Sequence, residues 1–296
     1  MAAWASGAKG TFLRTTDGGV TWTPNVVPGA ADADFRAVHA FSEKSAFLMS
    51  AGTGPLSRLY QSDDGGVKWN LVMVNPDPKG FWDGIAFWDR MHGILLGDPL
   101  DGRFEIWTTS DGGDTWKQQK GPQALEHEGI FAASNSSLIV RGAHDAWFAT
   151  GGPDGARILH SGDDGRSWTA VKTPVRHDSD NAGVFSLAFS DARHGVAVGG
   201  DYSKPKEAMS VIAITSDGGK NWTAPASSPG GYRSAVAYIE PEKMWIAAGP
   251  SGSDVSLDDG KTWKSFDSGS YNAIGFTGSS GWAVGQKGVI ASFHAR

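Results

Sequence analysis

Short apolar runs recur along the whole chain, and runs rich in Gly, Asp and Ser separate them. Clear examples are Phe35–Phe41, Ala46–Ala51 and Gly195–Gly199. Runs of this length, bounded by turn-forming residues, are typical of β-strands, whereas helix-favouring stretches are scarce. The pattern therefore predicts an all-β chain of many short antiparallel strands joined by tight turns.

One polar segment returns between these apolar runs with a fixed internal spacing, Ser/Thr-x-Asp-x-Gly-x-x-Trp. Its six copies, here called the boxes, are Thr15–Trp22, Ser62–Trp69, Thr109–Trp116, Ser161–Trp168, Thr215–Trp222 and Ser256–Trp263. A fixed motif that recurs every 40–50 residues or so indicates a propeller or another repeat array.

Each box follows one strand-like run and precedes another, so it is interpreted as the hairpin between two antiparallel strands. Glycines supply the positive φ angles of a tight turn, and the Asp carboxylate and Ser/Thr hydroxyl can accept bonds from backbone N–H groups. The alternative is that the six aspartates are metal ligands or catalytic acids. We favour the structural role, because a catalytic group is needed once rather than six times.

The boxes resemble the Asp-box, or BNR repeat, of sialidases, sortilin-type receptors and xyloglucan hydrolases, all of which are β-propellers. In those families the box lies on the rim, away from the ligand. The resemblance therefore implies a propeller fold, and implies that any site lies at the opposite ends of the strands.

Counting strands predicts the number of blades, where strands a to d run from the inside of a blade outward. Residues 4–28 supply strands b to d, five later repeats supply four strands each, and residues 271–293 supply a to c. We expect a single domain, residues 1–296, forming a β-propeller of four-stranded antiparallel blades. Seven blades are favoured, and six remain the alternative.

Composition narrows the possible functions. The net charge of −6 argues against nucleic acid as a partner, and the absence of Cys excludes disulfides and thiolate chemistry. No apolar run approaches the roughly 18 residues of a membrane helix. The histidines lack metal-ligand spacing, and no Gly-rich phosphate loop opens a helix, so we expect no metal and no cofactor.

In a propeller, strand a begins at the mouth of the central channel, on the face opposite the boxes. Aligning the repeats brings two arginines, several aromatic side chains and polar groups to this mouth, where they could bind an anionic or sugar-like ligand. A second interpretation is that Arg36 pairs with Asp83 on the channel wall. The candidate ligand-binding residues are Arg36, Trp82, Asp83, Ser137, Asn181, Asp201, Tyr202, Tyr232, Arg233 and Tyr271.

An enzymatic role is the alternative to a binding role. A glycoside hydrolase, sialidase-like or of another BNR-repeat kind, needs two facing carboxylates roughly 5–10 Å apart. The candidate carboxylates are Asp83, Asp98, Asp101, Glu126, Glu128 and Asp201, but nothing in the sequence pairs them. The Phe35–Val38 run carries Ala and Val where the sialidase Phe-Arg-Ile-Pro signature has Ile and Pro. We therefore assign no catalytic residues.

Over most of its length, the chain resembles bacterial proteins related to the plant photosystem II stability/assembly factor. The shared features are a repeated Gly-x-Ala-Val-Gly strand and boxes ending in Asp-Gly-Gly-x-x-Trp. The resemblance implies a non-catalytic binding platform for an assembling partner. We expect a monomer that holds a protein partner, or a carbohydrate or anionic ligand, at the channel mouth. We expect an extracytoplasmic location, periplasmic or secreted, although the first residues lack the features of a signal peptide.

Overall fold

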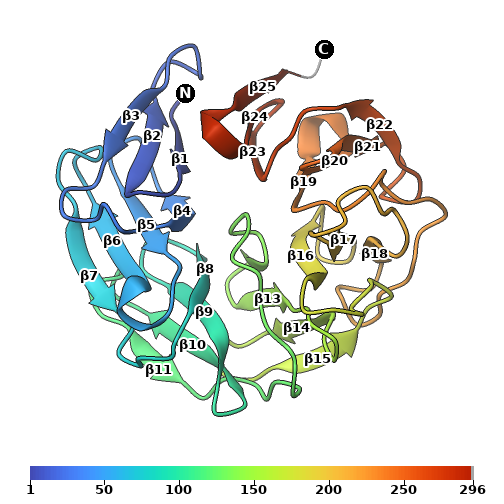
Figure 1. Ribbon diagram of the computed structural model, residues 1–296, viewed down its shortest axis with the longest axis horizontal. Helices are drawn as coiled ribbons and strands as arrows, with labels where there is room; N and C mark the ends of the chain where they lie inside the picture. The colour runs from blue at the N-terminus through green and yellow to red at the C-terminus, as the bar shows by residue number, and fades with distance from the viewer. Residues whose placement is uncertain (295–296) are drawn as a thin grey trace. The chain divides into compact units, whose positions relative to one another are not determined.

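The computed structural model describes residues 1–294, which form strands β1 to β25 and three short 3₁₀ helices, η1 to η3 (Figure 1). Within each sheet, strands that are consecutive in the chain lie side by side, and the pairs are antiparallel. Among the described residues, no helix is long and apolar enough to cross a membrane. The sequence expectation of an all-β chain is confirmed.

The first of two compact units comprises Met1–Ala124, Val140–Ala146 and Ser161–Ser167. Three complete sheets lie in it, each with its strands in chain order. They are β1 (Ala3–Ser6), β2 (Thr11–Thr15) and β3 (Thr23–Val26); β4 (Phe35–Ala40), β5 (Ala46–Ser50), β6 (Arg58–Ser62) and β7 (Asn70–Val74); and β8 (Trp82–Phe87), β9 (Gly93–Leu100), β10 (Arg103–Thr109) and β11 (Lys117–Gln119). Helix η1 (Gly54–Leu56) joins β5 to β6.

The second unit comprises Leu125–Ile139, Trp147–His160 and the residues from Trp168 onward. Three complete sheets lie in it: β16 (Ala182–Phe189), β17 (Gly195–Asp201) and β18 (Ile212–Thr215); β19 (Ala235–Ile239), β20 (Met244–Gly249), β21 (Gly252–Ser256) and β22 (Lys264–Asp267); and β23 (Ala273–Thr277), β24 (Ser280–Val284) and β25 (Ile290–His294). Helices η2 (Glu240–Glu242) and η3 (Gln286–Gly288) lie in its connections. The remaining sheet, which is the fourth in chain order, is formed by β12 (Leu138–Arg141), β13 (Asp145–Ala149), β14 (Arg157–Ser161) and β15 (Thr169–Lys172).

Seven antiparallel sheets in chain order make this fold class a seven-bladed β-propeller, as the repeat count predicts. The first and last sheets have three strands, also as predicted. The β16–β18 sheet differs, because its expected fourth strand is reduced to a single bridge between Ile214 and Thr223. Pro225 follows two residues later, and proline has no N–H to continue a ladder.

The boxes are hairpins that fasten themselves with their own side chains. In the box between β10 and β11, the Thr109 hydroxyl donates to Asp111 Oδ1 (2.8 Å) and accepts from the Gly113 N–H (3.0 Å). The Thr115 N–H donates to the same carboxylate at 3.0 Å. The hydroxyl bond to the N–H four residues on recurs in all six boxes. The predicted structural role of the boxes is confirmed in its geometry.

Strand register places each box at one end of its sheet. In the β4–β7 sheet, Phe35 lies opposite Ser50 and Ala40 lies opposite Ala46, which pairs in turn with Ser62. Ser62 begins the box, so the box lies at the Ala40 end, while the Phe35 end carries the residues proposed for the mouth. The length of the strands separates the two.

Candidate functional site

The inner strands of three sheets carry a β-bulge at the same position. The register shifts between Phe35 and Ala37 in β4, and equivalent shifts flank Asp83 in β8 and Phe185 in β16. The extra residues are therefore Arg36, Asp83 and Phe185. A bulge changes the direction in which a side chain points at the end of a strand. The same backbone irregularity therefore sets the side-chain direction of all three residues.

Arg36 reaches solvent in the first unit. Its side chain is 49% exposed, and its Nε donates to Asp34 Oδ2 at 2.6 Å. An exposed ion pair of this kind contributes only about 0–1 kcal/mol to stability, so the guanidinium can exchange its partner for a ligand at little cost. Arg36 is the mouth residue that the structure presents most openly in this unit.

Trp82, by contrast, lies in the core with an exposed fraction of 0%. It packs in one cluster with Ala37, Phe47, Leu59 and Ile85, which come from its own sheet and the preceding one. Its backbone N–H donates to Ser57 Oγ at 3.0 Å. Its indole therefore serves inter-sheet packing in this structure rather than a surface.

Asp83 is also buried, with 1% exposed, and neither of its carboxyl oxygens has a hydrogen-bond partner. The predicted ion pair with Arg36 is therefore wrong. Burial raises the pKa of Asp83 well above its ordinary value, and the nearby carboxylates of Asp98 and Glu105 raise it further. The backbone N–H of Asp98, which donates to the Phe81 carbonyl rather than to Asp83, opposes this rise only in part. Glu105 accepts bonds from Asn75 (3.0 Å) and Trp107 (3.2 Å), whereas Asp83 has no such support.

In the second unit, Arg233 is a buried structural cation rather than an exposed ligand. Its side chain is 1% exposed, and its Nε donates to Asp254 Oδ2 at 2.6 Å. Its Nη1 donates to the Tyr232 carbonyl (2.9 Å) and to Ser251 Oγ (3.0 Å). These bonds use the guanidinium inside the protein, so the expectation of an open arginine here does not match its surroundings.

Tyr202 is the most exposed aromatic candidate, with 49% of its surface accessible. It directly follows β17 and stands edge-on to the rings of Phe131 (6.4 Å between centroids) and Phe185 (6.1 Å). Those two rings stack at 3.8 Å, and Phe185 also meets Tyr232 edge-on at 4.7 Å. Tyr202 therefore packs against a stacked pair of aromatic rings, while one side of its own ring faces solvent.

Asp201 holds the loop that carries Tyr202. One carboxyl oxygen accepts the backbone N–H (2.9 Å) and hydroxyl (2.6 Å) of Ser203, which keeps the Asp201 pKa below its ordinary value even though burial raises it. The Tyr202 N–H donates to the Asn181 carbonyl at 3.2 Å. Asp201 and Asn181 thus position the loop, and the buried Asp201 carboxylate (2% exposed) is occupied by its own turn.

The remaining candidates lie mostly inside the protein. Ser137 is fully buried and its hydroxyl has no partner. Tyr232 is 5% exposed, and burial raises its pKa strongly. Tyr271 is half-buried, and burial raises its pKa, with the nearby Asp267 carboxylate adding to the rise. Of the ten predicted residues, those with accessible side chains are Arg36, Asn181, Tyr202 and Tyr271.

Two features of the second unit were missed by the sequence interpretation. Phe131, in the connection before β12, forms the base under Tyr202. The loop after β17, residues 202–210, is largely exposed and carries Lys204, Lys206 and Met209, the last with 77% exposed. The length of this loop, compared with the turn between β20 and β21, was the available signal.

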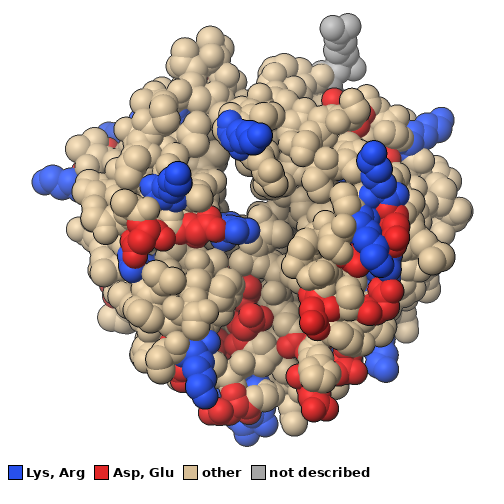
Figure 2. All heavy atoms as spheres, in the orientation of Figure 1, with Lys and Arg blue, Asp and Glu red and all other residues tan. Residues whose placement is uncertain are grey.

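Charge on the face drawn in Figure 2 is mixed: Lys and Arg side chains lie beside Asp and Glu side chains. Residues 1–294 contain no group of three or more His, Asp or Glu side chains placed to hold a metal ion. The chemistry that the accessible candidates offer is therefore aromatic packing, amide hydrogen bonding and a guanidinium for a carboxylate or phosphate.

Comparisons with known proteins identify a matching family and several relatives of this chain. Residues 61–232 match the family described as photosynthesis system II assembly factor YCF48. The chain is 24% identical to the photosystem II assembly protein Ycf48 of Synechococcus sp., over 98% of this chain and 81% of that protein. It is 25% identical to the photosystem II assembly lipoprotein Ycf48 of Picosynechococcus sp., over 98% and 80%.

A solved structure described as YCF48 bound to D1 peptide superimposes with a TM-score of 0.69. It is 20% identical and covers 100% of this chain and 90% of its own. At that identity, the likeness supports the propeller fold alone.

Proposed function

The chain belongs to the photosystem II assembly factor (YCF48) family, and from that premise we propose that it is a non-catalytic platform for an assembling protein partner. The partner's contact segment is an extended peptide. It docks at the strand ends opposite the boxes; the support for a peptide ligand is one relative, which is described as bound to D1 peptide.

The observation that carries the proposal is the packing of the exposed Tyr202 side chain on two other aromatic rings. An aromatic side chain that is 49% exposed normally remains mobile, but here Phe131 and Phe185 support it from beneath. Rigid, half-exposed aromatic residues supply much of the binding energy at protein interfaces, because little conformational entropy is lost when they are covered.

The loop beyond Tyr202 indicates the chemistry of the segment. Met209 offers adaptable apolar surface, and Lys204 and Lys206 are exposed cations. Lys204 lies 3.8 Å from the buried Asp201 carboxylate, so its ammonium is only loosely held. An apolar peptide with a nearby carboxylate, such as a chain terminus or an acidic side chain, suits this combination.

We also propose that the chain functions outside the cytoplasm. The support is the relative from Picosynechococcus sp., whose name is assembly lipoprotein. A carbohydrate ligand, expected as an alternative from the sequence, is not favoured by any residue placement described above.

The experiment is a titration of the chain with a synthetic D1 peptide, followed by fluorescence anisotropy. Tyr202→Ala should weaken binding about tenfold or more, as expected for a central interface aromatic. Lys204→Ala should weaken it less, since an exposed ammonium is only partly desolvated when bound. Both variants should keep the melting temperature of the parent.

Phe266→Ala is the matched control, because Phe266 is 48% exposed but lies on the outer strand β22. It should bind the peptide as the parent does. The proposal fails if the parent does not bind D1 peptide, or if Tyr202→Ala binds as well as the parent. Turnover of glycosides by the parent would instead favour the enzymatic alternative.

A further inference from the structure

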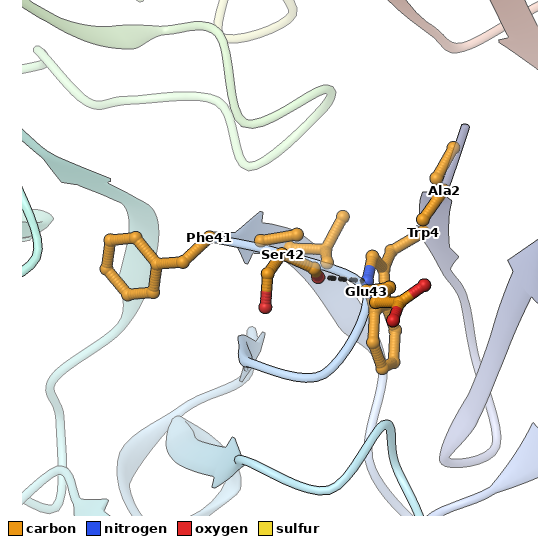
Figure 3. Close-up of a pocket in the computed structure, with 8 residues that line it drawn as sticks. Ala2, Trp4, Phe41, Ser42 and Glu43 are labelled. Atoms are coloured by element: carbon orange, nitrogen blue, oxygen red, sulfur yellow. Dashed lines mark hydrogen bonds between the residues drawn. The ribbon is translucent and has the colours of Figure 1, made fainter. Parts of the chain in front are cut away.

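Two pockets of the first unit differ in the side chains that line them. The larger, of about 400 Å³, lies between Trp4 and the turn that follows β4 (Figure 3). Among the described residues that line it, Glu43 is the one charged side chain. The Trp4 indole N–H already donates to the Ser42 carbonyl at 3.0 Å. This pocket therefore offers few polar groups with which to recognise a ligand.

The smaller pocket, of about 230 Å³, is lined mainly by polar side chains. It lies between the end of the β8–β11 sheet that carries its box and residues 161–167 of the next box, all within the first unit. Pockets for drug-sized ligands are larger, roughly 300–1,000 Å³, so this one suits a compact molecule. It is at the end of the strands opposite the residues proposed for the mouth.

Two cations from different sheets line the smaller pocket, Lys117 on β11 and Arg166 in the following box. Within residues 1–294, the Lys117 ammonium has no ion-pair partner. The Arg166 guanidinium is 72% exposed and lies 3.4 Å from Asp164, so it is loosely held. Two positive charges in one small pocket repel each other, and an anion between them removes that repulsion.

The two aspartates of the lining are already engaged by the protein. Asp111 accepts bonds from hydroxyl and N–H groups of its own box, and Asp164 is bonded at 2.8 Å to the histidine in the turn between β12 and β13. The Ser110 hydroxyl and the Lys117 ammonium, in contrast, have no acceptor within residues 1–294. The unused hydrogen-bonding groups are therefore mainly donors, which suit the oxygens of a carboxylate or phosphate.

Trp88 supplies an apolar wall that is fixed in place. Its indole N–H donates to the Asp145 carbonyl at 2.8 Å. Beside it in the lining, the Gln119 side-chain amide donates to Thr108 Oγ1 at 2.9 Å. Side chains that are already held lose little conformational freedom when a ligand covers them. The pocket can therefore take an apolar group next to the anion.

The other repeats lack this pair of cations. Lys117 directly follows the Trp of one box, and Arg166 stands two residues before the Trp of the next. At these positions, the other four pairs of consecutive boxes carry Thr23 with Val67, Asn70 with Asp114, Thr169 with Lys220, and Thr223 with Lys261. The repeated hairpin thus forms without two cations at this junction, so the fold does not explain why they coincide here.

We propose that the smaller pocket is a binding site for a small organic oxyanion, a compact molecule that carries a carboxylate or a phosphate. Lys117 and Arg166 bind the oxyanion from adjacent sheets, and the Ser110 hydroxyl donates to it. The apolar part of the molecule packs on Trp88. This site goes beyond the proposed peptide binding and is independent of the Tyr202 loop.

The test measures binding of four probes to the full chain by calorimetry at low ionic strength. The probes are benzoate, phenyl phosphate, inorganic phosphate and the uncharged benzamide. Benzoate, phenyl phosphate or both should bind and raise the melting temperature, and the tighter of the two identifies the preferred oxyanion. Inorganic phosphate should bind more weakly than phenyl phosphate, because it leaves Trp88 uncovered. Benzamide should not bind.

Substitutions test whether the two cations hold the anion. Lys117→Gln and Arg166→Gln should each weaken binding about tenfold or more, because a charge-assisted hydrogen bond is lost. The matched controls are Lys264→Gln and Lys220→Gln, which remove the same charge at the same two box positions in the second unit. The controls should bind as the parent does, and all four variants should keep the melting temperature of the unliganded parent.

The proposal is overturned if neither benzoate nor phenyl phosphate binds the parent, or if benzamide binds as tightly as benzoate. An equal loss of binding in Lys117→Gln and Lys264→Gln would also overturn it, because the anion would then respond to overall charge. Tyr202→Ala should leave oxyanion binding unchanged. None of these outcomes bears on D1-peptide binding at Tyr202, so the two proposals fail separately.

Discussion

The guanidinium of Arg233 and the carboxylate of Asp254 form an ion pair inside the second unit, with Nη2 and Oδ2 2.5 Å apart and side chains 1% and 2% exposed. Asp254 also accepts the Gly230 N–H at 3.2 Å, so the pair fixes the approach to β19 as well as β21. Each of the two side chains compensates the buried charge of the other.

Breaking this pair should destabilise the protein strongly. Arg233→Ala or Asp254→Ala should each lower the free energy of unfolding by about 3–5 kcal/mol, because the remaining charge stays buried without compensation. The double variant should cost less than the sum of the two. Urea denaturation measures all three, and Arg36→Ala, which removes an exposed pair, should cost less than about 1 kcal/mol.

Removing one box hydroxyl should cost stability without altering side-chain volume. Thr109→Val leaves the Gly113 N–H without its acceptor, and we expect a loss of about 1–3 kcal/mol by thermal or urea unfolding. Ser110→Ala, at the exposed neighbouring position, should be almost neutral. Equal stability of the two variants would show that the hydroxyl bond is dispensable.

Acid should remove part of the stabilisation that the boxes provide. Bonds from the Thr115 hydroxyl and N–H, and from the Thr109 hydroxyl, lower the pKa of Asp111 from 3.8 to about 2, and the other box aspartates shift in the same direction. Because the folded pKa lies below the unfolded one, the stabilisation is present above about pH 4 and is lost as the pH falls toward 2. Melting temperatures across this range should fall steeply in the parent and less steeply in Asp111→Asn.

Asp83 should have the opposite dependence. Its folded pKa is raised, so the folded state is favoured at low pH and loses stability as the pH rises above about 4. Asp83→Asn has nearly the same shape but cannot ionise, so its melting temperature should exceed that of the parent at pH 8. The difference should shrink on acidification, and a less stable variant at pH 8 would contradict the account.

Much of the fold could be predicted from the sequence because one physical unit repeats. Each box combines a glycine-dependent turn with a hydroxyl–carboxylate pair, and Gly112 and Gly113 do adopt φ angles of 76° and 93°. Because the hydroxyl and carboxylate bonds of a box join residues that are close in the sequence, the structure of each copy can be predicted from its own residues. The expected fourth strand of the β16–β18 sheet is the exception: beyond the Ile214–Thr223 bridge, Pro225 has no N–H with which to continue the ladder.

The candidate site was harder to predict, because it depends on which way side chains point. Arg233 aligns with Phe35, Trp82 and Val184, which are apolar residues and are buried in the structure. The apolar character of this position in the other repeats therefore indicated that it faces inward. Its partner Asp254 comes from another strand and cannot be paired with it by spacing. The support of Tyr202 by Phe131 likewise joins residues distant in the sequence.

The separation of box and mouth along each sheet also bears on how such a chain can change over generations. In the β4–β7 sheet, Ser62 lies at one end of the register, and Phe35 and Arg58 lie at the other. Substitutions or insertions in the loops beyond Phe35 leave this hairpin intact, since its bonds lie at the other end of the sheet: Ser62 and Asp64 bind within the box, and the Gly65 N–H donates to the Lys44 carbonyl. Lineages can therefore diverge in the partner they recognise while inheriting the same folding instructions, and an engineer could exchange mouth loops between relatives on the same grounds.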